Sequence, residues 1–171
     1  ILRRFSRINF SEPPPVAAGE LYRIIGRATG ITDPYRAAKD RFTAMALTLL
    51  PAFEREIAHA RDPFDAALRL AIAGNVIDLG VKGNLSEEEA RRAMQSALDE
   101  PVAGDVAAFR DEVRAAGSIL YLADNAGELV FDIPLLRVMP AGGVTVAVRG
   151  EPVINDATLE DAEASGIPVI A

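Results

Sequence analysis

Apolar residues recur at helical spacing over residues 15–116, with polar residues at the positions between them. Asp33 and Asp62 each precede a proline. An N-cap residue followed by proline at the first helical position predicts a helix start. We therefore expect residues 1–116 to form an N-terminal helical bundle.

Further signals set boundaries within this helical region. Pro51 should end or kink the helix in which it lies, because proline lacks the amide hydrogen of a helix interior. Ser86 and Glu89 have the spacing of a capping box, and Gly117 is placed to end the last helix. The segment 64–80 is apolar on most faces and is predicted to be buried.

The pattern changes at residue 117, where short apolar runs begin to alternate with helical segments. The first run, SILYLA, has no polar face, as expected of a parallel strand covered on both sides. The predicted order is strand 118–123, helix 127–139 with a break at Pro134, strand 143–150, helix 156–166 and strand 167–171. This order predicts an α/β fold, in which a Rossmann-like parallel α/β/α sheet, incomplete in this chain, occupies residues 117–171.

Two pairs of polar residues follow the predicted strands. Asp124 and Asn125 come directly after the first strand, and Asn155 and Asp156 lie a few residues beyond the second. In open parallel sheets, ligands bind at the carboxyl ends of the strands, so we expect the two pairs to meet at one edge. Their oxygen ligands suit a hard divalent cation such as Mg²⁺, Mn²⁺ or Ca²⁺. The alternative is an ordinary turn, with Asp156 as a helix N-cap.

Three neighbouring residues indicate how a phosphate group would bind beside such a cation. Gly127 lies at a predicted helix start, where backbone N–H groups and the helix dipole favour an anion. Arg149 ends the second strand and is placed to pair with a phosphate oxygen, while Glu128 is placed to orient a water or a ligand. A nucleotide-binding module is the weaker alternative, because neither GxGxxG nor GxxxxGK[ST] occurs.

Asn75 and Asp78 form a further polar cluster inside an otherwise apolar segment. Their spacing of three places them on one helix face. One interpretation is a buried hydrogen-bonded pair that ties this helix to a neighbour, since a buried carboxylate needs a partner. The other is that this face lines the pocket at the sheet edge and contacts the substrate.

Composition excludes several classes of function. The net charge is −7, and a protein that binds the phosphate backbone would need a basic face, so we expect no nucleic-acid partner. The chain has no cysteine and one histidine, His59, so neither a disulfide framework nor a cluster of imidazole ligands is expected. No apolar stretch is long enough to span a bilayer, and we expect a soluble, cytoplasmic protein with no membrane partner.

Four motifs in order resemble one known family. DPYRAAKDRFTAMAL, AIAGNVIDLG, LADNAGELVFD and VRGEPVINDATLEDA are similar to motifs of the metal-dependent damage-control phosphatases, also called domain of unknown function 89. The chain looks most like the compact microbial branch, from about residue 15 to its end. The resemblance implies a helical bundle packed on a Rossmann-like domain, one divalent cation (Mg²⁺, Mn²⁺, Co²⁺ or Ni²⁺) and hydrolysis of small phosphate esters, notably sugar phosphates and damaged phosphometabolites.

The resemblance also implies roles for particular residues. The family's metal ligands correspond to Asp124, Asn125 and Asp156. The residues that correspond to positions lining the same pocket are Asn75 and Asp78, and the Arg-Gly after the second strand corresponds to Arg149 and Gly150. The chain departs from the family in lacking paired cysteines near its start and the region beyond the third strand. It also opens at Ile1 and closes on an apolar run, so we expect a fragment.

The expected reaction is phosphoryl transfer to water, assisted by the cation. Either Asp124 or a metal-bound water would attack phosphorus, and Glu128 or Asp78 would act as acid or base. Two other functions stay open. One is methyl transfer to protein carboxylates, and the other is a non-enzymatic module that binds metal or sugar phosphate or serves as a scaffold. The sequence predicts no oligomeric state.

Overall fold

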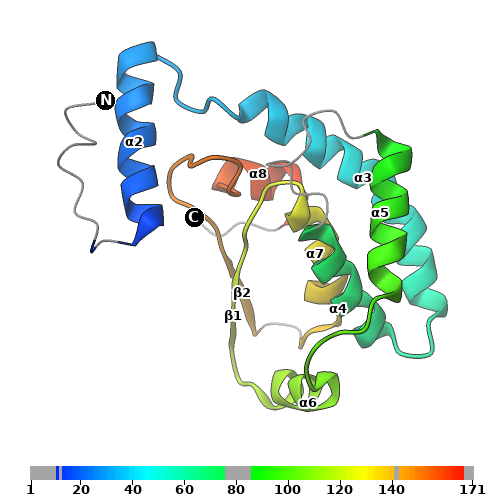
Figure 1. Ribbon diagram of the computed structural model, residues 1–171. Helices are drawn as coiled ribbons and strands as arrows, with labels where there is room; N and C mark the ends of the chain where they lie inside the picture. The colour runs from blue at the N-terminus through cyan, green and yellow to red at the C-terminus, as the bar shows by residue number, and fades with distance from the viewer. Residues whose placement is uncertain (1–10, 12, 76–85, 141–142, 168–171) are drawn as a thin grey trace.

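The structure is a computed structural model that describes residues 11, 13–75, 86–140 and 143–167. Helices form the N-terminal part, and two strands alternate with helices in the rest (Figure 1). The elements in chain order are α2 (Pro14–Thr29), α3 (Arg36–His59), α4 (Pro63–Gly74), α5 (Glu87–Asp99), α6 (Val106–Ala115), β1 (Ile119–Leu122), α7 (Glu128–Val138), β2 (Val144–Ala147) and α8 (Leu159–Ala164). None of the described helices combines the length and the apolar character needed to cross a membrane.

Local side-chain chemistry starts the helices. The Asp62 carboxylate accepts a hydrogen bond from the amide of Asp65 at the start of α4, as predicted. Ser86 and Glu89 form the predicted reciprocal capping box of α5. Asp33 is not the N-cap that was predicted, because α3 begins three residues later. Its carboxylate instead accepts a hydrogen bond from the amide of Tyr35 in the preceding turn (2.9 Å).

Prolines and glycine act differently from their predicted roles. Pro51 does not end its helix, because α3 continues through it to His59. The break predicted at Pro134 is wrong, since α7 runs unbroken to Val138. Pro134 is buried, so tertiary packing holds the helix despite the missing amide hydrogen bond. The helix α6 ends as predicted near Gly117, but this glycine does not adopt a positive φ.

The strands confirm the α/β class. β1 and β2 are parallel, with Ile119 paired to Val144 and Leu122 paired to Ala147. The prediction that β1 is covered on both sides is wrong for the described residues, because Leu120 and Leu122 are 65% and 72% exposed. Only the alternate side chains of β1 face the helices. The third predicted strand lies outside the described residues from 168 onwards.

A single helix, α7, forms the centre of the main core. It packs against α4 and α3, and α5 covers α4 (Figure 1). Leu129, Val130 and Phe131 are completely buried, and the Phe131 ring meets that of Phe53 edge to face at 6.2 Å. The predicted burial of residues 64–80 holds for the described inner face of α4, including Leu70. The start of α7 is therefore held by contacts with α3 and α4.

We predict a large difference between two leucine truncations. Leu70→Ala should lower the free energy of unfolding by about 2–5 kcal/mol, because Leu70 is fully buried between α4 and its neighbours. Leu120→Ala is the matched control and should change it by less than about 0.5 kcal/mol. Urea unfolding followed by circular dichroism measures both, and equal losses would contradict the packing described here.

Candidate active site

The segment that follows β1 lies beside the segment that precedes α8. The amide of Ala157 donates to the carbonyl oxygen of Asp124 at 2.7 Å. Asn125 and Asp156 form an isolated antiparallel bridge. Asn125 and Asp156 are 31 residues apart in the sequence. The backbone thus brings the three predicted metal ligands to one edge of the sheet.

Further main-chain bonds connect this junction to the strands. Ala126 donates to the carbonyl of Asn155 at 3.0 Å, and Ala123 donates to the carbonyl of Ala147 at 3.0 Å. The amide of Arg149 donates back to Ala157 at 2.8 Å. The junction is therefore continuous with the β1–β2 pair, and its geometry is set by backbone hydrogen bonds.

The Asn125 side chain is oriented by Glu128. Its Nδ2 donates to Glu128 Oε1 at 2.6 Å, and both side chains are buried. A carboxylate only accepts hydrogen bonds, so the amide nitrogen of Asn125 must face Glu128. This leaves Asn125 Oδ1, an oxygen suited to a hard cation, as the atom on the opposite side of the amide group.

The Arg149 side chain forms an ion pair with the Asp156 carboxylate. Its Nε donates to Asp156 Oδ2 at 2.6 Å, in a pair that is partly exposed on the arginine side. The contact fixes the direction of the Asp156 carboxylate and supplies a cation within the junction. Gly150, which follows, is exposed, and a Cβ there would meet open space, so packing does not require glycine at this position.

Gly127 has a packing role at the start of α7. A Cβ at this position would lie 3.1 Å from the Cβ of Phe42, so a side chain would press against α3. This close contact accounts for the glycine without any ligand. The N-terminus of α7 has no side-chain cap, and its dipole still favours an anion at the junction.

A pocket of about 420 Å³ opens beside the junction. Asp124, Glu128 and Asn75 line its polar end, which places Asn75 in the same pocket as the two acidic residues. The pocket runs along α4, α6, α7 and β1, whose apolar side chains form its walls. Asp78, the partner predicted for Asn75, lies outside the described residues.

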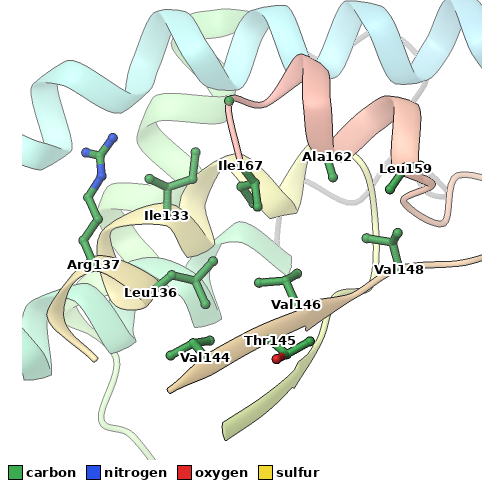
Figure 2. A pocket seen from close by; sticks show the side chains of 11 residues that line it. Ile133, Leu136, Arg137, Val144, Thr145, Val146, Val148, Leu159, Ala162 and Ile167 are labelled. Carbon is green, nitrogen blue, oxygen red and sulfur yellow. The ribbon is translucent and has the colours of Figure 1, made fainter. Parts of the chain in front are cut away.

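A second pocket has a different chemistry. It measures about 540 Å³ and lies between β2, α7 and α8, with mostly aliphatic side chains directed into it (Figure 2). Arg137 and Thr145 supply its few polar groups, and none of the predicted ligands lines it. It suits apolar side chains better than a phosphate ester, so we place the candidate site at the smaller, acidic pocket.

Asp132 also lines the acidic pocket, and the sequence patterns did not identify it. Asp132 lies one helical turn after Glu128, and its carboxylate is hydrogen-bonded to Tyr121. Burial raises the pKa of Asp132 to about 6, and the nearby charge of Asp124 adds to the rise, although the Tyr121 hydrogen bond opposes it. Glu128 and Asp132 are four residues apart in an otherwise apolar helix, and this spacing was the signal in the sequence that could have identified Asp132.

Tyr22 was also missed, because it lies on a helix with no polar motif. Its ring is 6.2 Å from that of Tyr35. Burial, a hydrogen bond with Tyr35 and the charges of Asp156 and Asp33 raise the pKa of Tyr22 to about 12. The helix α2 lies beside the loop after β2 (Figure 1), where Gly19 approaches Val153. This places Tyr22 near the Asp156 side of the junction.

The donor set at the junction fits a hard cation. Asp124, Asn125 and Asp156 offer only oxygen from their side chains, and hard divalent cations prefer oxygen. Among the described residues, no group of three or more histidine, cysteine, aspartate and glutamate side chains is arranged to hold a metal ion. Two carboxylates and one amide would therefore hold such a cation, with water or substrate completing its coordination.

Comparison with known proteins identifies the family of the chain. Residues 4–167 match the model of the damage-control phosphatase ARMT1-like domain. The chain belongs to this family. The family resemblance predicted from the four motifs is thereby confirmed.

Two relatives, one of them with a solved crystal structure, show the extent of the similarity. A damage-control phosphatase of Archaeoglobus fulgidus is 34% identical over 169 residues, covering 95% of this chain and 58% of the relative. Damage-control phosphatase PH1575 of Pyrococcus horikoshii is 34% identical over 152 residues, covering 86% and 50%. A crystal structure of a domain of unknown function 89 protein from P. horikoshii superposes with a TM-score of 0.72 at 32% identity, covering 85% and 50%. The chain spans about half the length of these curated relatives.

The raised pKa of Asp132 predicts a pH-dependent stability difference. The folded protein binds this proton more tightly than the unfolded chain, whose ordinary pKa is 3.8. Between about pH 4 and pH 6 the folded state therefore holds more protons, and its stability falls as pH rises. Relative to Asp132→Asn, the unaltered protein should lose on the order of 2 kcal/mol across this interval.

Urea unfolding of both proteins at pH 4 and pH 7 measures this difference. The comparison cancels the titration of all other groups that the substitution leaves unaltered. Parallel stability profiles would show that Asp132 titrates normally in the folded protein.

Proposed function

We propose that this member of the damage-control phosphatase family hydrolyses phosphate monoesters of small metabolites, such as sugar phosphates or damaged phosphometabolites, with one divalent cation. The observation that carries the proposal is the backbone pairing of Asp124 and Asn125 with the segment 156–157. It joins the predicted ligands beside an acidic pocket. The relatives named as damage-control phosphatases support the reaction class.

The finer description of the fold belongs to the same proposal. The parallel β1–β2 pair and the helices that pack on it support a Rossmann-like α/β/α sheet that follows an N-terminal helical bundle. In such a sheet the junction after β1 and β2 lies at the carboxyl ends of the strands, where ligands bind.

Each polar side chain at the junction has a proposed task. Asp124, Asn125 and Asp156 hold the cation, which when bound neutralises charge on the phosphoryl oxygens. Glu128 fixes the rotation of the Asn125 amide, and Arg149 fixes the Asp156 carboxylate. These contacts keep the ligands in place before the substrate arrives, so little reorganisation accompanies binding.

The N-terminus of α7 takes the phosphate in this proposal. Gly127 has no side chain to cover the first turn, and the helix dipole attracts phosphoryl oxygens. Asn75 lines the same pocket, so its amide is placed to bind the remainder of the substrate. Asp124 is exposed at the junction, which agrees with a group that contacts substrate or cation.

Removing Asp124 should abolish turnover. Partners of metal ligands typically contribute 10–100-fold, so loss of a ligand itself in Asp124→Ala should lower phosphate release at least about 100-fold. Release from p-nitrophenyl phosphate with Mn²⁺, and its loss on chelation, measures this. Asp111→Ala on exposed α6 is the control and should retain the original rate. An unaltered rate in Asp124→Ala would exclude the assignment.

A bound cation should also stabilise the folded protein. Mn²⁺ at about 100 times its Kd should add about 2.7 kcal/mol to the free energy of unfolding, because only the folded state presents the assembled ligands. Asp156→Asn should reduce this gain, whereas Asp111→Asn should leave it intact. Denaturation with and without Mn²⁺ measures both. Stabilisation without any phosphate release would favour a non-enzymatic binding module.

A further inference from the structure

A lysine is buried at the start of α3, beside the helix that follows the candidate site. Lys39 is 1% exposed, and its Nζ donates to Asp161 Oδ2 of α8 at 3.0 Å. The same Nζ lies 3.2 Å from Asp33 Oδ2, in the turn that precedes α3. Figure 1 shows α8 lying beneath the first turns of α3, in agreement with their packing.

This cluster is a costly way to join two helices. Charges lose hydration when they are buried, and an apolar pair of similar volume often stabilises a protein as well or better. Burial by itself would raise the pKa of Asp161, but hydrogen bonds from Thr158, Lys39 and Arg36 lower it. The Asp161 carboxylate is therefore favoured in its ionised form, and its hydrogen bonds are directional, which an apolar contact would not achieve.

One route from Lys39 to the junction passes through Asp161. Besides Lys39 and Arg36, Asp161 binds Thr158, whose amide and Oγ1 donate to Asp161 Oδ2 at 2.8 and 2.6 Å. Thr158 in turn forms a parallel bridge with Arg149, the residue that binds the Asp156 carboxylate. The turn that carries Asp156 thus has Arg149 at one end and Thr158 at the other, and these two residues pair with each other. Lys39 is connected to both ends through Asp161 and Thr158.

A second route passes through the other carboxylate of the cluster. Asp33 and Asp156 both lie near enough to Tyr22 for their charges to affect its hydroxyl. Asp33 is itself held by Lys39. Tyr22, whose ring lies 6.2 Å from that of Tyr35, is therefore near both a Lys39 partner and the candidate ligand.

We infer that Lys39 is a positioning residue, which holds the turn carrying Asp156 against the segment carrying Asp124. One route runs from Lys39 through Asp161 to Thr158, and the other runs through Asp33 to Tyr22, which lies near Asp156. Lys39 itself is buried between α3 and α8 and does not contact the substrate. The inference deepens the proposed function and rests on it only for its effect on the cation.

Hydrogen exchange of the metal-free protein tests the positioning directly. Lys39→Met should increase exchange at the amide of Ala157, which donates to Asp124, by at least about tenfold relative to amides of α4 and α5. Arg110→Met is the matched control, because it removes a partly buried cation that binds Asp62 far from the junction. It should leave exchange at Ala157 unaltered.

Cation affinity provides the functional readout. Titration calorimetry with Mn²⁺ alone, well below the melting temperature, should give a Kd at least about tenfold weaker for Lys39→Met. The control should bind like the unaltered protein even where its melting temperature falls. Failure of the unaltered protein to bind Mn²⁺ would refute the proposed function, whereas the exchange measurement would still test Lys39.

A milder variant covers the case in which Lys39→Met does not fold. Asp33→Asn leaves the Lys39–Asp161 pair in place, and it should give a smaller rise in exchange at Ala157 and a smaller loss of Mn²⁺ affinity. Lys39→Arg, which keeps the charge, should recover part of both. Unaltered exchange at Ala157 in the folded variants, or an equal rise in Arg110→Met, would overturn the inference.

Discussion

The main-chain hydrogen bond from Ala157 to Asp124 is the contact on which the candidate site depends. It closes a loop between the end of β1 and the segment that follows β2, and the neighbouring bridge brings Asn125 beside Asp156. A backbone pairing of this kind brings the three residues to one junction at once. The side-chain partners, Glu128 and Arg149, then need only to fix rotation, because position is already determined.

The sequence predicted this junction because its signals were local or periodic. Apolar runs marked β1 and β2, and polar residues directly after them identified Asp124 and Asp156. The rule that parallel strands share a carboxyl edge then brought the two segments together. Caps such as Asp62 and Ser86 were predictable for the same reason, since each involves residues three apart in the chain. Asp33 was misplaced because a turn competed for the same carboxylate.

The remaining features depend on contacts between distant segments. No local pattern pairs Lys39 with Asp161, which lies 122 residues away, or brings Tyr22 near Asp156. The continuity of α7 through Pro134 is similarly a property of the packing, because burial outweighs the lost hydrogen bond. The pairing of Arg149 with a phosphate oxygen stays a prediction, and the structure adds a contact between its Nε and Asp156 that the sequence did not predict.

The charge at the junction argues for a cation in the proposed reaction. Asp124 and Glu128 line the pocket, Asp132 lies in it and Asp156 adjoins it, whereas Arg149 is already paired. A phosphate monoester would therefore enter a region of its own sign, in a chain whose net charge is −7. The dipole of α7 offsets only about half an elementary charge. A divalent cation held by the same carboxylates would offset most of this negative charge and present a positive centre to the phosphate, so the acidic character that repels a free phosphate becomes the means of binding it.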